Sequence, residues 1–211
     1  MRWSRGAILA ALWLAGCTTV PSLPPPSENP AATWQARQLA LAPLTHWNIQ
    51  GRLALRTADK GGQGSLQWVR DQDRHTIDIT GPLGRGHMRL TQDRDGAELR
   101  DADQKIWYAP NAQQLLFRTT GWLIPLDGLN YWMLGLPAPE AAASQDLDEW
   151  GRLKTLRQSG WDIRFLEYTR IGSLDLPSKL FVKKLPENAD GNDPNNATLE
   201  VRLLIEHWAL N

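Results

Sequence analysis

The chain has 211 residues, of which 42% are hydrophobic and 22% charged, and this is enough apolar sequence for one globular core. Its 23 basic and 23 acidic residues balance, so net charge favours neither a nucleic-acid-binding protein nor a protein held to membranes by overall positive charge. Cys17 is the only cysteine, which excludes an intramolecular disulfide.

The N-terminal residues MRWSRGAILAALWLAGC have the pattern of a secretory signal peptide. Two arginines precede an apolar run from Ala7 to Ala15, which is far shorter than the ~20 residues of a transmembrane helix. Leu14 to Cys17 resembles the lipobox of bacterial lipoproteins, in which the cysteine is acylated after the signal is removed. We therefore predict a signal peptide at residues 1–16 and lipidation of Cys17. The alternative is an ordinary secreted protein that is cleaved near a cysteine.

Residues 17–30 are rich in proline, serine and threonine and show no periodicity, which predicts an extended tether between the lipid and the folded domain. Residues 31–211 have a suitable length for a single domain. Loss of Arg2 and Arg5 with the signal leaves 21 basic and 23 acidic residues, a net charge of −2. In bacterial lipoproteins an aspartate after the cysteine retains the protein at the inner membrane, so Thr18 implies an outer-membrane destination.

The first predicted element is a helix from Pro30 to about Leu41. Asn29 is a good N-cap residue, and Pro30 suits the first helical turn. Trp34 and Leu41 fall on one side of this helix, which is the side we expect to be buried.

Short strands follow the helix. In residues 46–56, HWNIQGRLALR, the apolar residues Trp47, Ile49 and Leu53 alternate with polar ones, as in a half-buried antiparallel strand. The outward arginines of such strands, including Arg52, Arg56 and Arg89, are typical of a solvated sheet face, and a basic face that meets an acidic protein partner is the alternative. Many such strands predict one large curled sheet, with a barrel or half-barrel preferred over a sandwich. The same alternation recurs at residues 64–68, 77–79, 88–90, 161–165 and 199–205.

The stretch TGPLGRG connects two of these strands. Gly81, Pro82, Gly84 and Gly86 predict a turn, because glycine admits positive φ and proline fixes φ near −65°. Leu83 is therefore expected to be exposed. A single exposed leucine is common and by itself indicates no function.

Residues 110–137 interrupt the strand pattern and predict two short helices. We expect Asp127 to cap the second helix, and Gly135 with Pro137 to end it. Such a helix over the open face of a curled sheet would act as a lid. The alternative, that these residues only complete a core, is favoured by the pattern alone. The apolar residues with helical spacing are Leu129, Trp132, Met133 and Leu136.

Other chemical motifs are weak. Residues 190–196, DGNDPNN, lack the order of an EF-hand loop and its closing glutamate. The chain has no GxSxG motif. We expect no cofactor, no bound metal and no enzymatic activity. The four histidines do not have metal-binding spacing: His46, His75, His87 and His207.

A resemblance to a known family gives these elements a function. The segment from Thr120 to Pro137 is similar to the TG..IPL..L..W.LGLP signature of the LolB family, the outer-membrane receptors of the lipoprotein-localisation (Lol) pathway. The order of lipobox, tether, WNIQGRLAL strand and PLG turn also fits. The resemblance implies a mainly β fold, a half-open antiparallel β-barrel with an α-helical lid, shared with the periplasmic carrier LolA.

The resemblance also implies the function. A LolB-like receptor takes lipoproteins from LolA by binding their acyl chains in an apolar cavity and inserts them into the outer membrane without nucleotide hydrolysis. The implied partners are LolA, acylated lipoprotein cargo and outer-membrane lipid, with no nucleic acid, and the implied state is a monomer anchored at the periplasmic face through Cys17. A structural or interaction lipoprotein with a filled core and a lipid-modifying enzyme remain the alternatives.

The resemblance assigns site residues as well. Leu83 occupies the family's membrane-contact position, where Arg85 departs from the small polar residue expected beside it. The residues expected to form the acyl-chain cavity and its lid are Trp47, Ile49, Leu53, Leu66, Trp68, Ile77, Ile79, Met88, Leu90, Ile124, Leu126, Leu129, Trp132 and Leu136.

Overall fold

The computed structural model describes residues 25–58, 60–121, 124–139, 141–185 and 199–210. The predicted signal peptide, Cys17 and the loop at 190–196 lie outside the described residues, as does the tether up to residue 24.

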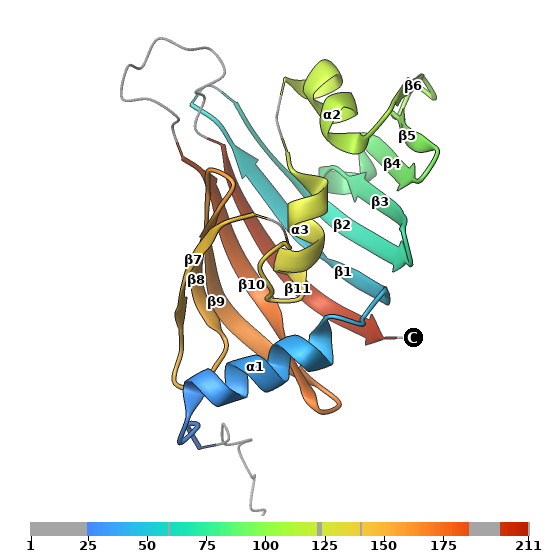
Figure 1. Ribbon diagram of the computed structural model, residues 1–211. Coiled ribbons are helices and arrows are strands. Elements are labelled where there is room, and N and C mark those ends of the chain that lie inside the picture. The colour runs from blue at the N-terminus through green and yellow to red at the C-terminus, as the bar shows by residue number, and fades with distance from the viewer. Residues whose placement is uncertain (1–24, 59, 122–123, 140, 186–198, 211) are drawn as a thin grey trace, which may run out of the picture.

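All described strands belong to one antiparallel sheet of 11 strands (Figure 1). The strand order is β6-β5-β4-β3-β2-β1-β11-β10-β9-β8-β7, so β6 and β7 are edge strands and the sheet is not closed. The predicted half-open barrel is confirmed, and the sandwich alternative is wrong, because no second sheet exists within the described residues. The strands are β1 His46–Arg56, β2 Gly61–Asp71, β3 Arg74–Thr80, β4 His87–Asp93, β5 Gly96–Arg100, β6 Ile106–Ala109, β7 Ala143–Leu147, β8 Leu153–Gln158, β9 Trp161–Ile171, β10 Leu174–Lys184 and β11 Glu200–Leu210.

Strand β1 lies at the centre of the sheet and shows why the alternating sequence folds this way. Its inward residues Trp47, Ile49 and Leu53 are buried, as predicted. The pairing of β1 with β11 shifts at Gly51, where an added Cβ would lie 2.0 Å from the Leu204 carbonyl oxygen. Glycine is therefore required at this point, because any larger residue would separate the two strands.

Helix α1, Pro30–Leu41, has the predicted bounds and contacts β7. Asn29 caps it by accepting a hydrogen bond from the Ala32 backbone N–H over 3.1 Å. The side chains of Trp34 and Leu41 are buried, as the pattern predicted.

The two helices predicted within residues 110–137 are also present. Helix α2, Ala112–Thr120, packs against β4, β5 and β6, while α3, Leu126–Met133, lies across the inner face of the curled sheet (Figure 1). The prediction that Asp127 caps α3 is wrong, because the helix begins after Pro125 and Asp127 lies within its first turn. None of the described helices is long and apolar enough to cross a membrane.

Candidate functional site

An apolar cavity of about 100 Å³ lies between the sheet and the two helices α2 and α3. Five strands supply its floor, namely β1, β2, β3, β4 and β11. Thr120 is the polar residue in the lining, and its hydroxyl donates a hydrogen bond to the Leu116 carbonyl over 2.7 Å. The lining residues are Leu53, Leu55, Leu66, Trp68, Ile77, Ile79, Met88, Leu90, Leu116, Thr120, Ile124, Leu126, Leu129, Val201 and Leu203.

Most residues expected to form the cavity do line it. The alternation of apolar residues places Leu55, Val201 and Leu203 on the inward face of their strands but does not distinguish cavity from core. Leu116 was missed because the pattern did not show which side of α2 would face the sheet. The predicted residues that line the cavity are Leu53, Leu66, Trp68, Ile77, Ile79, Met88, Leu90, Ile124, Leu126 and Leu129.

Trp47 and Ile49 lie outside the cavity, although both are fully buried. The Trp47 ring lies edge-on to Trp68, with centroids 5.2 Å apart, and to Trp208, with centroids 5.7 Å apart. These three tryptophans form a cluster that packs beside the cavity, with Trp68 shared between the two. The cluster gives this part of the core a fixed aromatic packing.

Trp132 and Leu136 also lie outside the cavity, although both are buried. The Trp132 Nε1–H donates to Gln158 Oε1 over 3.0 Å, and the ring lies 6.3 Å from that of Trp161. Gln158 Oε1 also accepts from the Ala138 N–H over 2.8 Å. The buried Gln158 amide thus fixes the segment that follows the helix, because each of its polar atoms has a partner.

Gln92 in β4 joins the beginnings of the two helices. Its Oε1 accepts a hydrogen bond from the Ala112 N–H, over 2.7 Å, at the first turn of α2. Its Nε2 donates to Asp127 Oδ1, over 3.2 Å, in the first turn of α3. One side chain therefore holds both helices against the sheet.

The cavity residue Trp68 is held by a buried histidine. Trp68 Nε1–H donates to His75 Nδ1 over 3.2 Å. Burial, together with the nearby Arg70 charge, lowers the pKa of His75 to about 4. His75 is therefore neutral near pH 7, as a ring nitrogen that accepts a hydrogen bond requires.

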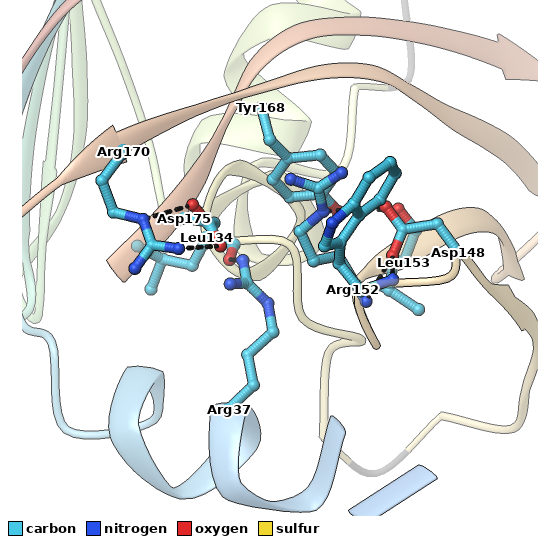
Figure 2. A network of polar contacts seen from close by, with 9 residues as sticks. Arg37, Leu134, Asp148, Arg152, Leu153, Tyr168, Arg170 and Asp175 are labelled. Atoms are coloured by element: carbon cyan, nitrogen blue, oxygen red, sulfur yellow. Dashed lines mark hydrogen bonds and ion pairs between the residues drawn. The ribbon is translucent and has the colours of Figure 1, made fainter. Parts of the chain in front are cut away.

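A polar network ties α1 to the segment after α3 (Figure 2). The Arg37 side chain reaches from α1 toward Leu134, and its Nη2 lies 3.5 Å from the Leu134 carbonyl oxygen. Its guanidinium also lies 5.4 Å from the centre of the Tyr168 ring, which stacks on Arg152. Burial lowers the pKa of Arg37, and its Nε has no hydrogen-bond partner among the described residues. The Arg37 side chain therefore positions α1 mainly by packing against Tyr168, because its hydrogen bond to Leu134 is long.

Leu83 is 93% exposed, as the turn pattern predicted. It adopts φ 58° and ψ 26°, a left-handed conformation that costs a leucine about 1 kcal/mol. The turn is closed by a hydrogen bond of 2.9 Å from the Gly81 N–H to the Gly86 carbonyl, and an added Cβ at Gly81 would lie 2.2 Å from the Arg85 carbonyl oxygen. The turn thus holds an apolar side chain in water at an energetic cost.

Two of the described histidines each lie beside a single aspartate. His87 Nε2 lies 2.8 Å from Asp78 Oδ1, and His46 Nε2 lies 3.1 Å from Asp71 Oδ1. In the described ranges, no group of three or more His, Cys, Asp or Glu side chains could hold a metal ion.

Comparisons with known proteins agree with this architecture. The family model described as "Outer membrane lipoprotein LolB" matches residues 45–208. The outer-membrane lipoprotein LolB of Nitrosococcus oceani is 38% identical over 213 residues and covers 100% of both chains. That of Alkalilimnicola ehrlichii is 35% identical over 203 residues, covering 96% of this chain and 94% of its own.

Among solved structures, a LolA superfamily protein from Nitrosomonas europaea aligns with a TM-score of 0.50 at 9% identity, covering 86% of this chain and 93% of that chain. At this identity the likeness shows the fold alone, and it agrees with the open eleven-stranded sheet. With matches along nearly the whole sequence, the chain belongs to the LolB family of outer-membrane lipoproteins.

Proposed function

We propose that this protein receives lipoproteins from the periplasmic carrier LolA, binds their acyl chains in the cavity beneath α2 and α3, and inserts them into the outer membrane. Family membership supports a role in lipoprotein localisation at the outer membrane. The observation that carries the finer proposal is the apolar lining of a cavity covered by two short helices. Each methylene that moves from water into such a cavity contributes about 0.8 kcal/mol.

The helices have to move for cargo to enter. A cavity of about 100 Å³ has room for roughly three water-sized groups, far less than a long acyl chain needs. Displacement of α2 and α3 would join the cavity to the open side of the sheet. We infer that the closed arrangement is the unloaded state and that Gln92 and Gln158 limit this movement.

Transfer without nucleotide hydrolysis requires a downhill sequence from carrier to receptor to bilayer. The chain has no Walker-type motif, so binding energy has to drive each step. Opening this small cavity breaks the contacts of α2 and α3, and this cost lowers the net affinity for acyl chains. A receptor of moderate affinity would release the chains to a membrane. In this scheme the protein works as a monomer without cofactor or catalytic residue, anchored at the periplasmic face through lipidated Cys17.

Leu83 is the proposed membrane contact. Full burial of one leucine contributes about 1.5–3 kcal/mol, which orients a tethered domain without anchoring it. The strained turn supports this role, because a turn that only reversed the chain would favour glycine at a left-handed position.

Acyl-chain binding can be tested with a fluorescent long-chain fatty-acyl probe. Ile79→Glu places a carboxylate in the cavity, where burial of the charge is costly, and we expect at least ten-fold weaker binding. Leu39→Glu, at a position 80% exposed on α1, is the matched control and should bind as the wild type does. Met88→Phe fills the cavity without adding charge and should also weaken binding. Equal binding by all variants, or none by the wild type, would support a structural lipoprotein instead.

A further inference from the structure

A second concave region lies on the opposite face of the sheet from the cavity. It is an open groove of about 820 Å³ between the Leu83 turn and strands β2, β1, β11, β10 and β9. Its basic residues alternate along the strands with the buried residues Leu53, Ile163, Leu180 and Leu203, so they point away from the core. These basic residues are Arg52, Arg164, Lys179 and Arg202.

The groove is basic although the whole chain is neutral. No aspartate or glutamate is among its lining residues, all of which lie in the described part of the chain. Arg52 pairs with Glu206 and Lys179 with Glu167, but both carboxylates lie outside the lining. Exposed pairs of this kind contribute little to stability, so their cations remain available to an anion.

Two arginines of the groove flank one aromatic ring. Phe181 pairs across the strands with Arg202 on one side and Arg164 on the other. Their guanidinium carbons lie 5.7 Å and 4.9 Å from the ring centre. Stacking uses the face of a guanidinium and leaves its N–H edge for a second, bidentate partner such as phosphate. Within the described residues Arg202 makes no ion pair, and Arg164 has only a 3.6 Å contact with Asp162.

We propose that this groove binds the phosphate headgroups of anionic phospholipids at the membrane surface. Its wall includes Leu83 and Leu166, which are 93% and 55% exposed. Cations beside an exposed leucine match a bilayer, where charged headgroups lie above hydrocarbon. An acidic protein surface would satisfy the cations but would leave Leu83 without an apolar layer to enter. This proposal shares one premise with the proposed function, namely that the Leu83 turn contacts the membrane.

The test measures binding to phosphatidylcholine vesicles with and without phosphatidylglycerol. The chain from residue 17, with Cys17→Ala, is compared with Arg164→Gln/Arg202→Gln and with Arg74→Gln/Arg94→Gln. The control pair removes the same charge at the ends of β3 and β4 distant from the Leu83 turn. Each surface arginine contributes roughly five-fold to anionic-membrane binding. We expect the groove variant to lose ten-fold or more of the preference for phosphatidylglycerol, while the control keeps it.

Several outcomes would overturn the inference. Equal losses in groove and control variants would mean that only net charge matters, and no preference in the wild type would mean that the groove binds no headgroup. A groove variant that binds vesicles normally but receives less cargo from LolA would assign the groove to the carrier. Cargo receipt from LolA is measured separately. If the wild-type chain accepts cargo but shows no preference for vesicles with phosphatidylglycerol, the headgroup proposal is wrong and the proposed function stands. If the wild-type chain prefers phosphatidylglycerol through the groove but accepts no cargo, the proposed function is wrong and the headgroup proposal stands.

Discussion

Gln92 Nε2 donates a hydrogen bond of 3.2 Å to Asp127 Oδ1 and so fastens the first turn of α3 to strand β4. The same side chain accepts from the Ala112 N–H in α2. We expect Gln92→Leu to weaken both attachments by about 1–2 kcal/mol in total. Faster amide hydrogen exchange in α2 and α3 would report this change, with Gln67→Leu on the exposed face of β2 as the control. Unchanged exchange in both helices would show that apolar packing alone holds them.

Arg37 gives a prediction with two substitutions. Arg37→Met keeps most of the packing volume and removes a partly buried charge whose Nε lacks a partner among the described residues. We expect its thermal stability to equal or exceed that of the wild type. Arg37→Ala leaves a cavity beside Tyr168 and should lower the free energy of unfolding by about 2–3 kcal/mol. If Arg37→Met destabilised the protein as much as Arg37→Ala, the guanidinium would have a stabilising polar role that its geometry does not indicate.

His75 should make stability depend on pH. Its pKa is lowered from 6.5 to about 4 in the folded protein, so the unfolded chain binds the proton first as the pH falls. The free energy of unfolding should therefore decrease between pH 6.5 and pH 4, by up to about 3 kcal/mol from this residue. Denaturant unfolding of His75→Gln at both pH values should show a smaller decrease than the wild type. A decrease of the same size in both proteins would mean that other groups cause it.

The Leu83 turn allows structural and functional effects to be separated. Glycine adopts a φ of 58° without the cost that leucine bears, but it also gains freedom in the unfolded chain. We expect Leu83→Gly to change the free energy of unfolding by less than about 1 kcal/mol while weakening vesicle binding. A large loss of stability would instead assign Leu83 to the folded structure.

Local patterns predicted much of this fold because they depend on neighbouring residues. The alternation in residues 46–56 and the Asn29–Pro30 helix start are examples, and both are confirmed. The division of the inward face between cavity and core depends on strand order and register, which a single sequence does not encode locally. Trp47 and Trp68 both fall on the inward face by alternation, but only Trp68 lines the cavity. Trp47 packs between the rings of Trp68 and Trp208.

Long-range hydrogen bonds were equally inaccessible to local patterns. Asp127 suits an N-cap by residue type, but its carboxylate accepts from Gln92, which is distant in sequence. Gln158 appears in an ordinary strand pattern, yet it satisfies Trp132 and the backbone of Ala138 in the interior. The placement of Arg164 and Arg202 beside Phe181 likewise depends on the register of β9, β10 and β11.

Transfer of acylated cargo can be followed in a reconstituted assay. The chain from residue 17, with Cys17→Ala, is given LolA loaded with labelled lipoprotein, and the label is followed to the chain and then to liposomes. We expect the wild-type chain to pass label to the liposomes, whereas Leu83→Glu accepts cargo and fails to release it to them. If label never leaves LolA for the wild-type chain, the protein does not receive cargo, and a structural outer-membrane lipoprotein is favoured.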